Sequence, residues 1–189
     1  RQTSSVVLNK LAAVLPQLMG GSADLAPSNL SDMKDTDEIK YGTFAPDSYE
    51  GRNIHFGIRE HAMAAIANGM QLHGGIQAYC ATFFVFSDYC KPAMRLAALM
   101  NIPVTYIMTH DSIGVGEDGP THEPVEQLIS LRSIPGMKVY RPADGKETAA
   151  AWISALTGTQ PTALVLTRQN LPQYVNSGLA ALKGGYVLE

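Results

Sequence analysis

The sequence lacks the features that mark several large classes of protein. Lysine and arginine number 14 against 17 aspartates and glutamates, and the basic residues form no stripe along the chain. Because binding to nucleic acid depends on neutralising many phosphates, we expect no nucleic-acid partner. No apolar run approaches the roughly 20 residues that a membrane span requires, so we expect no membrane partner either.

Cysteine is scarce, and closely spaced metal ligands are missing. Cys80 and Cys90 are the only cysteines, and both stand among aromatic and apolar residues. This setting is typical of buried free thiols in a reducing compartment, so we expect a cytoplasmic protein. His110 and His122 are twelve residues apart with no cysteine nearby. The sequence therefore predicts no metal site of its own.

Segments with helical spacing alternate with short apolar runs. Residues 1–20 form an entry linker and helix, with Leu18 and Met19 on its apolar side; Pro16 should kink or end this helix, and Gly20-Gly21 closes it. Residues 22–50 are rich in Ser, Asp, Asn, Pro and Gly and predict a long loop. Further helices are predicted over 60–73, up to Met100, over 123–134 and over 144–156. Strands are predicted at 53–56, 76–84, 103–109 and 161–169, and residues 137–144 are predicted to form a strand followed by a turn.

This alternation indicates an α/β domain with a mostly parallel sheet. The near-continuous apolar character of 103–109 and 162–167 predicts helices on both faces of that sheet. The chain begins at Arg1 without a methionine, and "GGYVLE" resembles the start of a strand. We therefore expect residues 1–189 to be a single domain of a longer multidomain chain, with 181–189 leading into a further domain.

Chemistry in such sheets collects in the loops beyond the carboxyl ends of the strands. Glu60, in the first of these loops, has two interpretations. It can stabilise the start of a helix through the helix dipole, or it can share a proton with a bound heterocycle. A Glu60–His61 acid–base pair is disfavoured, because adjacent helical residues point in different directions.

Two other loops carry polar or aromatic groups. Phe83, Phe86 and Tyr89 are spaced by three, so they form either an aromatic core cluster or a stacking wall for a flat ring. The stretch "HDSIGVGEDGPTHEP" begins at His110 and is either a solvated loop or a binding loop. Its glycines predict positive-φ turns or a close approach of the backbone to a ligand. No Gly-Lys-Ser/Thr follows, so it is not a phosphate-cradling loop.

Six stretches together resemble one family. "GGSADLAPSN", "GIREHAM", "TFFVFSDY", "HDSIGVGEDGPTHEPVEQL", "RPAD" and "TRQNLP" are similar, in order and spacing, to the pyrimidine-binding (middle) domain of bacterial-type transketolases. "GIREHAM" is shared with related thiamine enzymes, whereas the long His-Asp-Ser-Ile loop with "TRQNLP" is specific to transketolases. The resemblance covers nearly the whole chain. It implies transfer of a two-carbon ketol unit between sugar phosphates, with thiamine diphosphate and a divalent metal, Mg or Ca.

The resemblance also implies roles for individual residues. Glu60 matches the glutamate that hydrogen-bonds the aminopyrimidine ring, and it is the expected catalytic residue together with His122. The expected cofactor-binding residues are Asp24, Leu25, Ile58, Glu60, Phe83, Phe86 and Tyr89. The expected substrate-binding residues are Arg1, Ser28, His110, Asp118, His122 and Arg168. Of these, Asp118 and His122 would address the sugar hydroxyls, and the other four would grip the phosphate.

Family members hold the diphosphate and the metal with a Gly-Asp-Gly…Asn signature in a separate amino-terminal domain, and this sequence lacks that signature. The family's active site lies between the two subunits of a homodimer. The resemblance therefore implies that the diphosphate-binding domain of a second subunit is the partner, and that this domain alone is inactive. Two alternatives stay open. One is a sister enzyme such as a dihydroxyacetone or deoxyxylulose-phosphate synthase, and the other is a non-catalytic interaction module with the same fold.

Overall fold

A computed structural model describes residues 1–188 and contains one six-stranded sheet. Its strand order is β2-β1-β3-β4-β6-β5, and every neighbouring pair is parallel. The strands are β1 (Leu18–Ser22), β2 (Asn53–His55), β3 (Gln77–Phe83), β4 (Thr105–Thr109), β5 (Lys138–Tyr140) and β6 (Thr162–Leu166). The prediction of an α/β fold with a mostly parallel sheet is confirmed.

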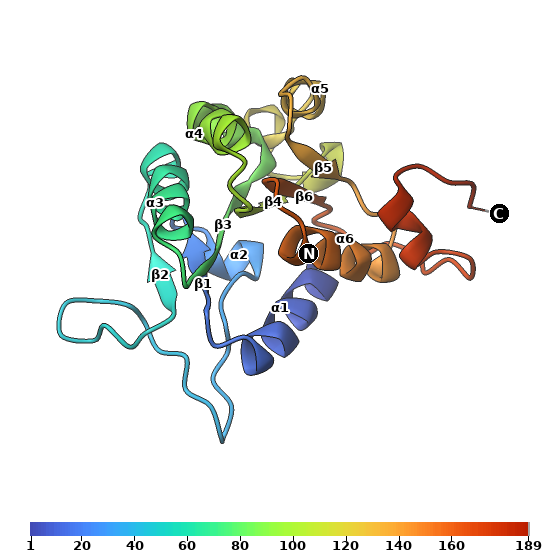
Figure 1. Cartoon of the computed structure of the whole chain (residues 1–189). Helices are drawn as coiled ribbons and strands as arrows, with labels where there is room; N and C mark the ends of the chain where they lie inside the picture. The colour runs from blue at the N-terminus through green and yellow to red at the C-terminus, as the bar shows by residue number, and fades with distance from the viewer. Residues whose placement is uncertain (189) are drawn as a thin grey trace.

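Helices cover both faces of the sheet (Figure 1). The five longer helices are α1 (Gln2–Val14), α3 (Glu60–His73), α4 (Ser87–Met100), α5 (Gln127–Arg132) and α6 (Gly145–Thr157). Two separate core clusters show the division: Tyr106 and Met108 pack with residues of α3, α4 and α5, whereas Ile107 packs with Leu8 of α1 and Trp152 of α6. Successive β4 side chains thus alternate between the two helical layers, as strand geometry requires.

The first helix ends just before Pro16, where the sequence predicted a kink or an end, and does not continue to Gly20-Gly21. It stops at Val14, ahead of Pro16, and the residues predicted to finish it form β1 in the interior of the sheet. Proline disrupts helical hydrogen bonding, and here the chain changes direction around it. Gly20 and Gly21 do not close a helix but lie within the strand. A Cβ on Gly20 would lie 2.0 Å from the carbonyl oxygen of Tyr79, so the neighbouring strand leaves no room for one.

Arg52 joins the end of α1 to the sheet. Its Nε donates to the carbonyl of Leu18 at 2.9 Å, while Nη1 and Nη2 donate to the carbonyls of Ala12 and Leu15 at 3.1 and 2.8 Å. The last carbonyls of a helix have no partner within the helix, so the half-buried guanidinium of Arg52 is a favourable cap for them. The same guanidinium lies over the ring of Tyr41, with its central carbon 5.1 Å from the ring centroid.

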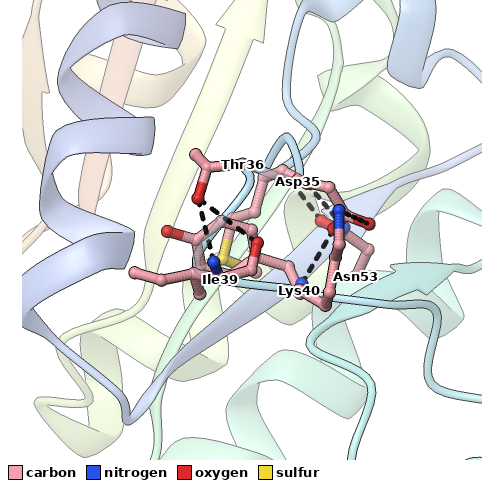
Figure 2. Close-up of polar contacts among 7 residues, drawn as sticks. Asp35, Thr36, Ile39, Lys40 and Asn53 are labelled. Atoms are coloured by element: carbon pink, nitrogen blue, oxygen red, sulfur yellow. Dashed lines mark hydrogen bonds and ion pairs between the residues drawn. The ribbon is translucent and has the colours of Figure 1, made fainter.

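The segment predicted as a loop over 22–50 contains the short helix α2 (Ala26–Asn29). The remainder is organised by side-chain hydrogen bonds (Figure 2). The Asn53 amide, at the start of β2, accepts from the N–H of Met33 at 2.8 Å and donates to its carbonyl at 2.9 Å. Farther along, Asp35 accepts from the N–H of Tyr41 at 2.8 Å. Side chains therefore replace the ladder bonds that regular elements would supply.

At the other end, η4 (Leu179–Lys183) packs against α6. Residues 184–188 form no strand, so the strand expected there is not found in the described part, and Glu189 lies outside the described residues. Within residues 1–188, no helix is both long enough and apolar enough to cross a membrane. Cys80 and Cys90 are buried free thiols, as predicted.

The clamp on Met33 gives a first prediction. Asn53→Ala leaves a buried N–H and a buried carbonyl without partners, which we expect to lower the free energy of unfolding by about 2–4 kcal/mol. Urea denaturation measures this change. Lys40→Ala is the control, because its contact with Asp35 joins two exposed side chains 3.9 Å apart (Figure 2). Equal midpoints for the two variants would show that Asn53 does not anchor the segment.

Candidate active site

The candidate residues gather along one edge of the sheet. Because all strands are parallel, their carboxyl ends meet at this edge, called here the carboxyl edge and marked by Ser22, His55, Phe83, Thr109 and Leu166. The candidates at or just beyond these ends are Asp24, Leu25 and Ser28 after β1, Ile58 and Glu60 after β2, Phe83, Phe86 and Tyr89 at β3, His110, Asp118 and His122 after β4, and Arg168 after β6.

Arg1 reaches the same edge from the start of the chain. Its amino group donates to the carbonyl of Thr167 at 3.3 Å, and its guanidinium donates to the carbonyl of Ser28. These two contacts tie the entry to α1 to the segments that follow β1 and β6. Residues 167 positions apart in the sequence, Arg1 and Arg168, are thereby brought to one end of the sheet.

The aromatic residues form a continuous stack. His110 lies 3.7 Å from Phe83 between ring centroids, Phe83 lies 6.0 Å from Phe86 with an interplanar angle of 4°, and Phe86 lies 5.8 Å from Tyr89. His122 meets Phe86 edge-on, at 5.4 Å and 74°. Phe83 is buried, but Tyr89 is 62% exposed. Only the inner end of this aromatic stack belongs to the core, and its outer end offers a ring face to a ligand.

The local sequence explains the stack. β3 ends at Phe83, the 3-10 turn η1 (Phe84–Phe86) follows, and α4 begins at Ser87. In a 3-10 turn that runs into an α-helix, residues three apart lie on one face. The spacing of Phe83, Phe86 and Tyr89 therefore places their rings in one row.

Glu60 is the first residue of α3, which is where a carboxylate gains from the helix dipole. Its side chain is half-buried, whereas His61 is exposed, and within residues 1–188 no hydrogen bond or ion pair joins the two. Burial, followed by the negative charge of Glu60, raises the pKa of the Cys90 thiol to about 12. Helix α3, which Glu60 begins, packs against α4, the helix that follows the aromatic stack.

Charged residues surround His110. Burial and the positive charge of Arg1 lower the pKa of His110 to about 4, with Arg168 acting in the same direction and Asp118 opposing it. Burial and the charge of Arg168 likewise lower the pKa of the Arg1 guanidinium. A guanidinium whose charge is disfavoured by a second cation forms a setting that an anion would stabilise.

The loop after β4 is held by an ion pair at its base. Arg141 donates through Nε and Nη2 to Oδ2 of Asp111, at 3.1 and 2.9 Å, and the Asp111 side chain is 2% exposed. Arg141 belongs to the "RPAD" stretch, whose place beside the site the sequence did not explain. It acts as a support for the residue next to His110.

The glycines of this loop behave only partly as predicted. Gly116 and Gly119 have φ values of 85° and 77°, which confirms the predicted positive-φ turns. Gly114 makes a close approach, but to a protein side chain: a Cβ there would lie 2.6 Å from Oε1 of Gln169. The loops after β4 and β6 are therefore packed directly on each other.

The sequence missed the residues behind His110. Ser22, Asn29 and Thr109 are all buried and form a chain of hydrogen bonds that ends on the Nδ1 atom of His110. Asn29 lies inside the "SADLAPSN" stretch and Thr109 directly precedes His110. Both residues lie in stretches that the sequence analysis singled out. The hydrogen bond between Asn29 and Thr109, which are 80 residues apart, depends on the register of the sheet and could not be predicted from local patterns.

The carboxyl edge suits a ligand that combines a flat ring with an anionic group. Ile58 and Ile113 are each 78% exposed and Tyr89 is 62% exposed, so the loops at the carboxyl edge present apolar surface. A neutral aromatic ring with hydrogen-bonding nitrogens matches this combination. No group of three metal-ligating side chains occurs among residues 1–188.

Comparison with known proteins identifies the family. The model for "Transketolase, pyrimidine binding domain" matches residues 1–173. The chain is 58% identical over its whole length to transketolases of Geobacillus stearothermophilus and Bacillus subtilis. A transketolase structure from Pichia stipitis, in complex with sedoheptulose-7-phosphate, matches 99% of the chain with a TM-score of 0.94 and 48% identity.

The match covers one region of each relative. The chain spans 28% of the length of the Geobacillus and Bacillus proteins and 28% of the Pichia chain. A transketolase structure from Campylobacter jejuni gives a similar result, with 49% identity, a TM-score of 0.85 and coverage of 94% of this chain and 27% of that one. The chain belongs to the transketolase family and corresponds to its pyrimidine-binding domain.

Proposed function

We propose that this chain is the pyrimidine-binding part of a transketolase, which transfers a two-carbon ketol unit from a ketose phosphate to an aldose phosphate. The observation that carries the proposal is the meeting of three groups at the carboxyl edge: the Glu60 carboxyl, the aromatic stack and the Arg1–Arg168 pair. The similarity to proteins named transketolase favours this activity over that of a sister synthase.

The cofactor that this edge would bind is thiamine diphosphate, through its pyrimidine end. Thiamine diphosphate supplies the carbanion chemistry of such reactions. Phe86 and Tyr89 offer ring faces for stacking, and Glu60 would hold a proton at a ring nitrogen. Asp24, Leu25 and Ile58, which follow β1 and β2 at the same edge, would contact the middle of the cofactor. The diphosphate and its Mg or Ca ion would be held by a different domain.

The substrate would be a sugar phosphate. Arg168 and Arg1 would bind the phosphate, because guanidinium groups grip phosphate oxygens in a bidentate manner. Ser28 and His110 would complete that grip, and Asp118 would bind sugar hydroxyls.

His122 would act on a proton at a substrate hydroxyl. Its Nδ1 pairs with the Thr121 hydroxyl at 2.8 Å, which leaves Nε2 for the substrate. Its ring also meets Phe83 and Phe86 edge-on, so the stack fixes its orientation. A histidine held in this way is suited to general acid–base work.

The chain would supply half of an active site. The other half would be the diphosphate-binding domain of a second subunit in a homodimer, covering the exposed side chains of Ile58, Tyr89 and Ile113. The two buried free thiols fit the cytoplasm as the location of the protein.

Replacement of Glu60 tests the proposed function. In the full-length protein, Glu60→Gln keeps the shape of the side chain but removes its ability to exchange a proton. We expect kcat/KM for ketol transfer to fall by about 100-fold or more. The control is Glu126→Gln, at the exposed start of α5, which should leave the rate unchanged. A Glu60→Gln enzyme with full activity would favour the non-catalytic interaction module instead.

The half-site proposal has its own test. Residues 1–189 alone, supplied with thiamine diphosphate, Mg and sugar phosphates, should show no ketol transfer, because the proposed diphosphate-binding half is missing. A coupled assay of product sugar phosphate measures this, with the full-length protein as the positive control. Circular dichroism of the fragment confirms that it is folded. Turnover by the folded fragment would contradict the half-site proposal.

A further inference from the structure

A buried chain of hydrogen bonds leads from the middle of the sheet to His110. The Ser22 hydroxyl donates to the carbonyl of Ala81 at 3.0 Å, and Nδ2 of Asn29 donates to the Ser22 hydroxyl at 2.7 Å. The Thr109 hydroxyl then donates to Oδ1 of Asn29 at 2.6 Å, and Nδ1 of His110 lies 2.8 Å from the Thr109 oxygen. All five residues are at most 3% exposed.

The direction of this chain is fixed at its inner end. A carbonyl oxygen can only accept, so the hydrogen of Ser22 is used on Ala81, and the Ser22 oxygen must accept from the Asn29 amide. The amide oxygen of Asn29 then faces Thr109 and takes its hydrogen. With the opposite orientation of the amide, Ser22 would turn its hydrogen to Asn29, and two acceptors would face each other at Ala81. The Thr109 oxygen is left as an acceptor for His110.

His110 is held rigidly at the outer end of the chain. Its ring stacks on Phe83 at 3.7 Å, and its backbone has a φ of 59°. That left-handed conformation costs a residue with a Cβ about 1–2 kcal/mol, so the surrounding structure must enforce it. Nε2 of His110 has no hydrogen-bond partner within residues 1–188.

We propose that Asn29 and Thr109 are positioning residues that hold His110 as its Nδ1–H tautomer, which makes Nε2 the atom that takes up a proton when a substrate phosphate binds. The uptake step rests on the proposed function, because it needs a phosphate ester at this edge. The tautomer itself does not.

The charges around His110 determine whether a proton is taken up or released when a phosphate ester binds. Burial and the charges of the Arg1 and Arg168 guanidiniums keep the imidazole neutral in the free site, and Asp118 opposes them only in part. A phosphate ester is mostly a dianion above its second pKa of about 6, and it cannot donate to a bare Nε2. Its negative charge favours the imidazolium, so one proton moves from solvent to Nε2 and is shared with a phosphate oxygen. Affinity should therefore fall as pH rises above neutrality.

The tautomer is tested in the full-length protein with ¹⁵N-ring-labelled histidine, and His110→Gln identifies the His110 signals by their loss. We expect a protonated Nδ1 and an unprotonated Nε2 in the wild type. Thr109→Ser should keep this pattern because it keeps the hydroxyl. Thr109→Val should lose it. Thr105→Val is the matched control on the same strand, since the Thr105 hydroxyl is buried without a partner. A protonated Nε2 and bare Nδ1 in the wild type would overturn the inference.

Proton uptake is tested by calorimetry of sorbitol 6-phosphate binding in buffers that differ in ionisation enthalpy. This probe keeps the phosphate ester and hydroxyls of a sugar phosphate but lacks a carbonyl group. We expect up to one proton taken up at pH 7.5 in the wild type, Thr109→Ser and Thr105→Val, and clearly less in Thr109→Val and His110→Gln. Equal uptake in all five proteins would overturn the role of Nε2. If the full-length wild-type protein still catalyses ketol transfer when one of these overturning results is found, the inference about His110 fails while the proposed function stands.

Discussion

The parallel alignment of β1, β3 and β4 is the constraint on which the site depends. In a parallel sheet every strand delivers its following loop to the same edge, so residues from five separate segments meet there. Gly20 and Gly21 allow this alignment, because the neighbouring strands leave no space for a Cβ at either position. The site therefore rests on a close backbone approach in the interior of the sheet and not on any single polar residue.

Buried polar groups behind the carboxyl edge form hydrogen bonds that connect the aligned strands to His110. The register that sets Ser22 opposite Ala81 also brings Asn29 against Thr109, and Thr109 against His110. Buried polar groups that are all paired specify one arrangement, because any other leaves donors or acceptors without partners. The Asp111–Arg141 ion pair holds the base of the neighbouring loop. Within residues 1–188, no hydrogen bond holds the side chain of Glu60 or Tyr89, and both side chains are at least partly exposed.

Short-range patterns predicted the layers well. The apolar runs marked most strands, and the spacing of Phe83, Phe86 and Tyr89 predicted a shared face, which the stacked rings confirm. β1 was mistaken for the end of a helix, because Leu18 and Met19 suit both periodicities and two glycines usually end a helix. Their real role depends on Tyr79 and Ile54, which only the sheet brings near. The hydrogen-bond chain to His110 was missed for the same reason.

The residue roles at the carboxyl edge were taken from a resemblance, and the geometry adds a physical reason for each cluster. The aromatic stack is open at its outer end, the Arg1 guanidinium lies in the field of Arg168, and the Glu60 carboxyl stands at the start of a helix. None of these features needs the others for folding. Their coincidence at one edge is what a shared ligand would explain.

Hydrogen–deuterium exchange of the full-length protein, with and without thiamine diphosphate and Mg, measures most directly whether the cofactor meets this edge. The account predicts slower exchange in segments 24–30, 57–62, 83–90 and 110–122, with no change in 174–188, which packs on α6 away from these loops. Unchanged exchange in the four edge segments, in a protein that binds the cofactor, would contradict it.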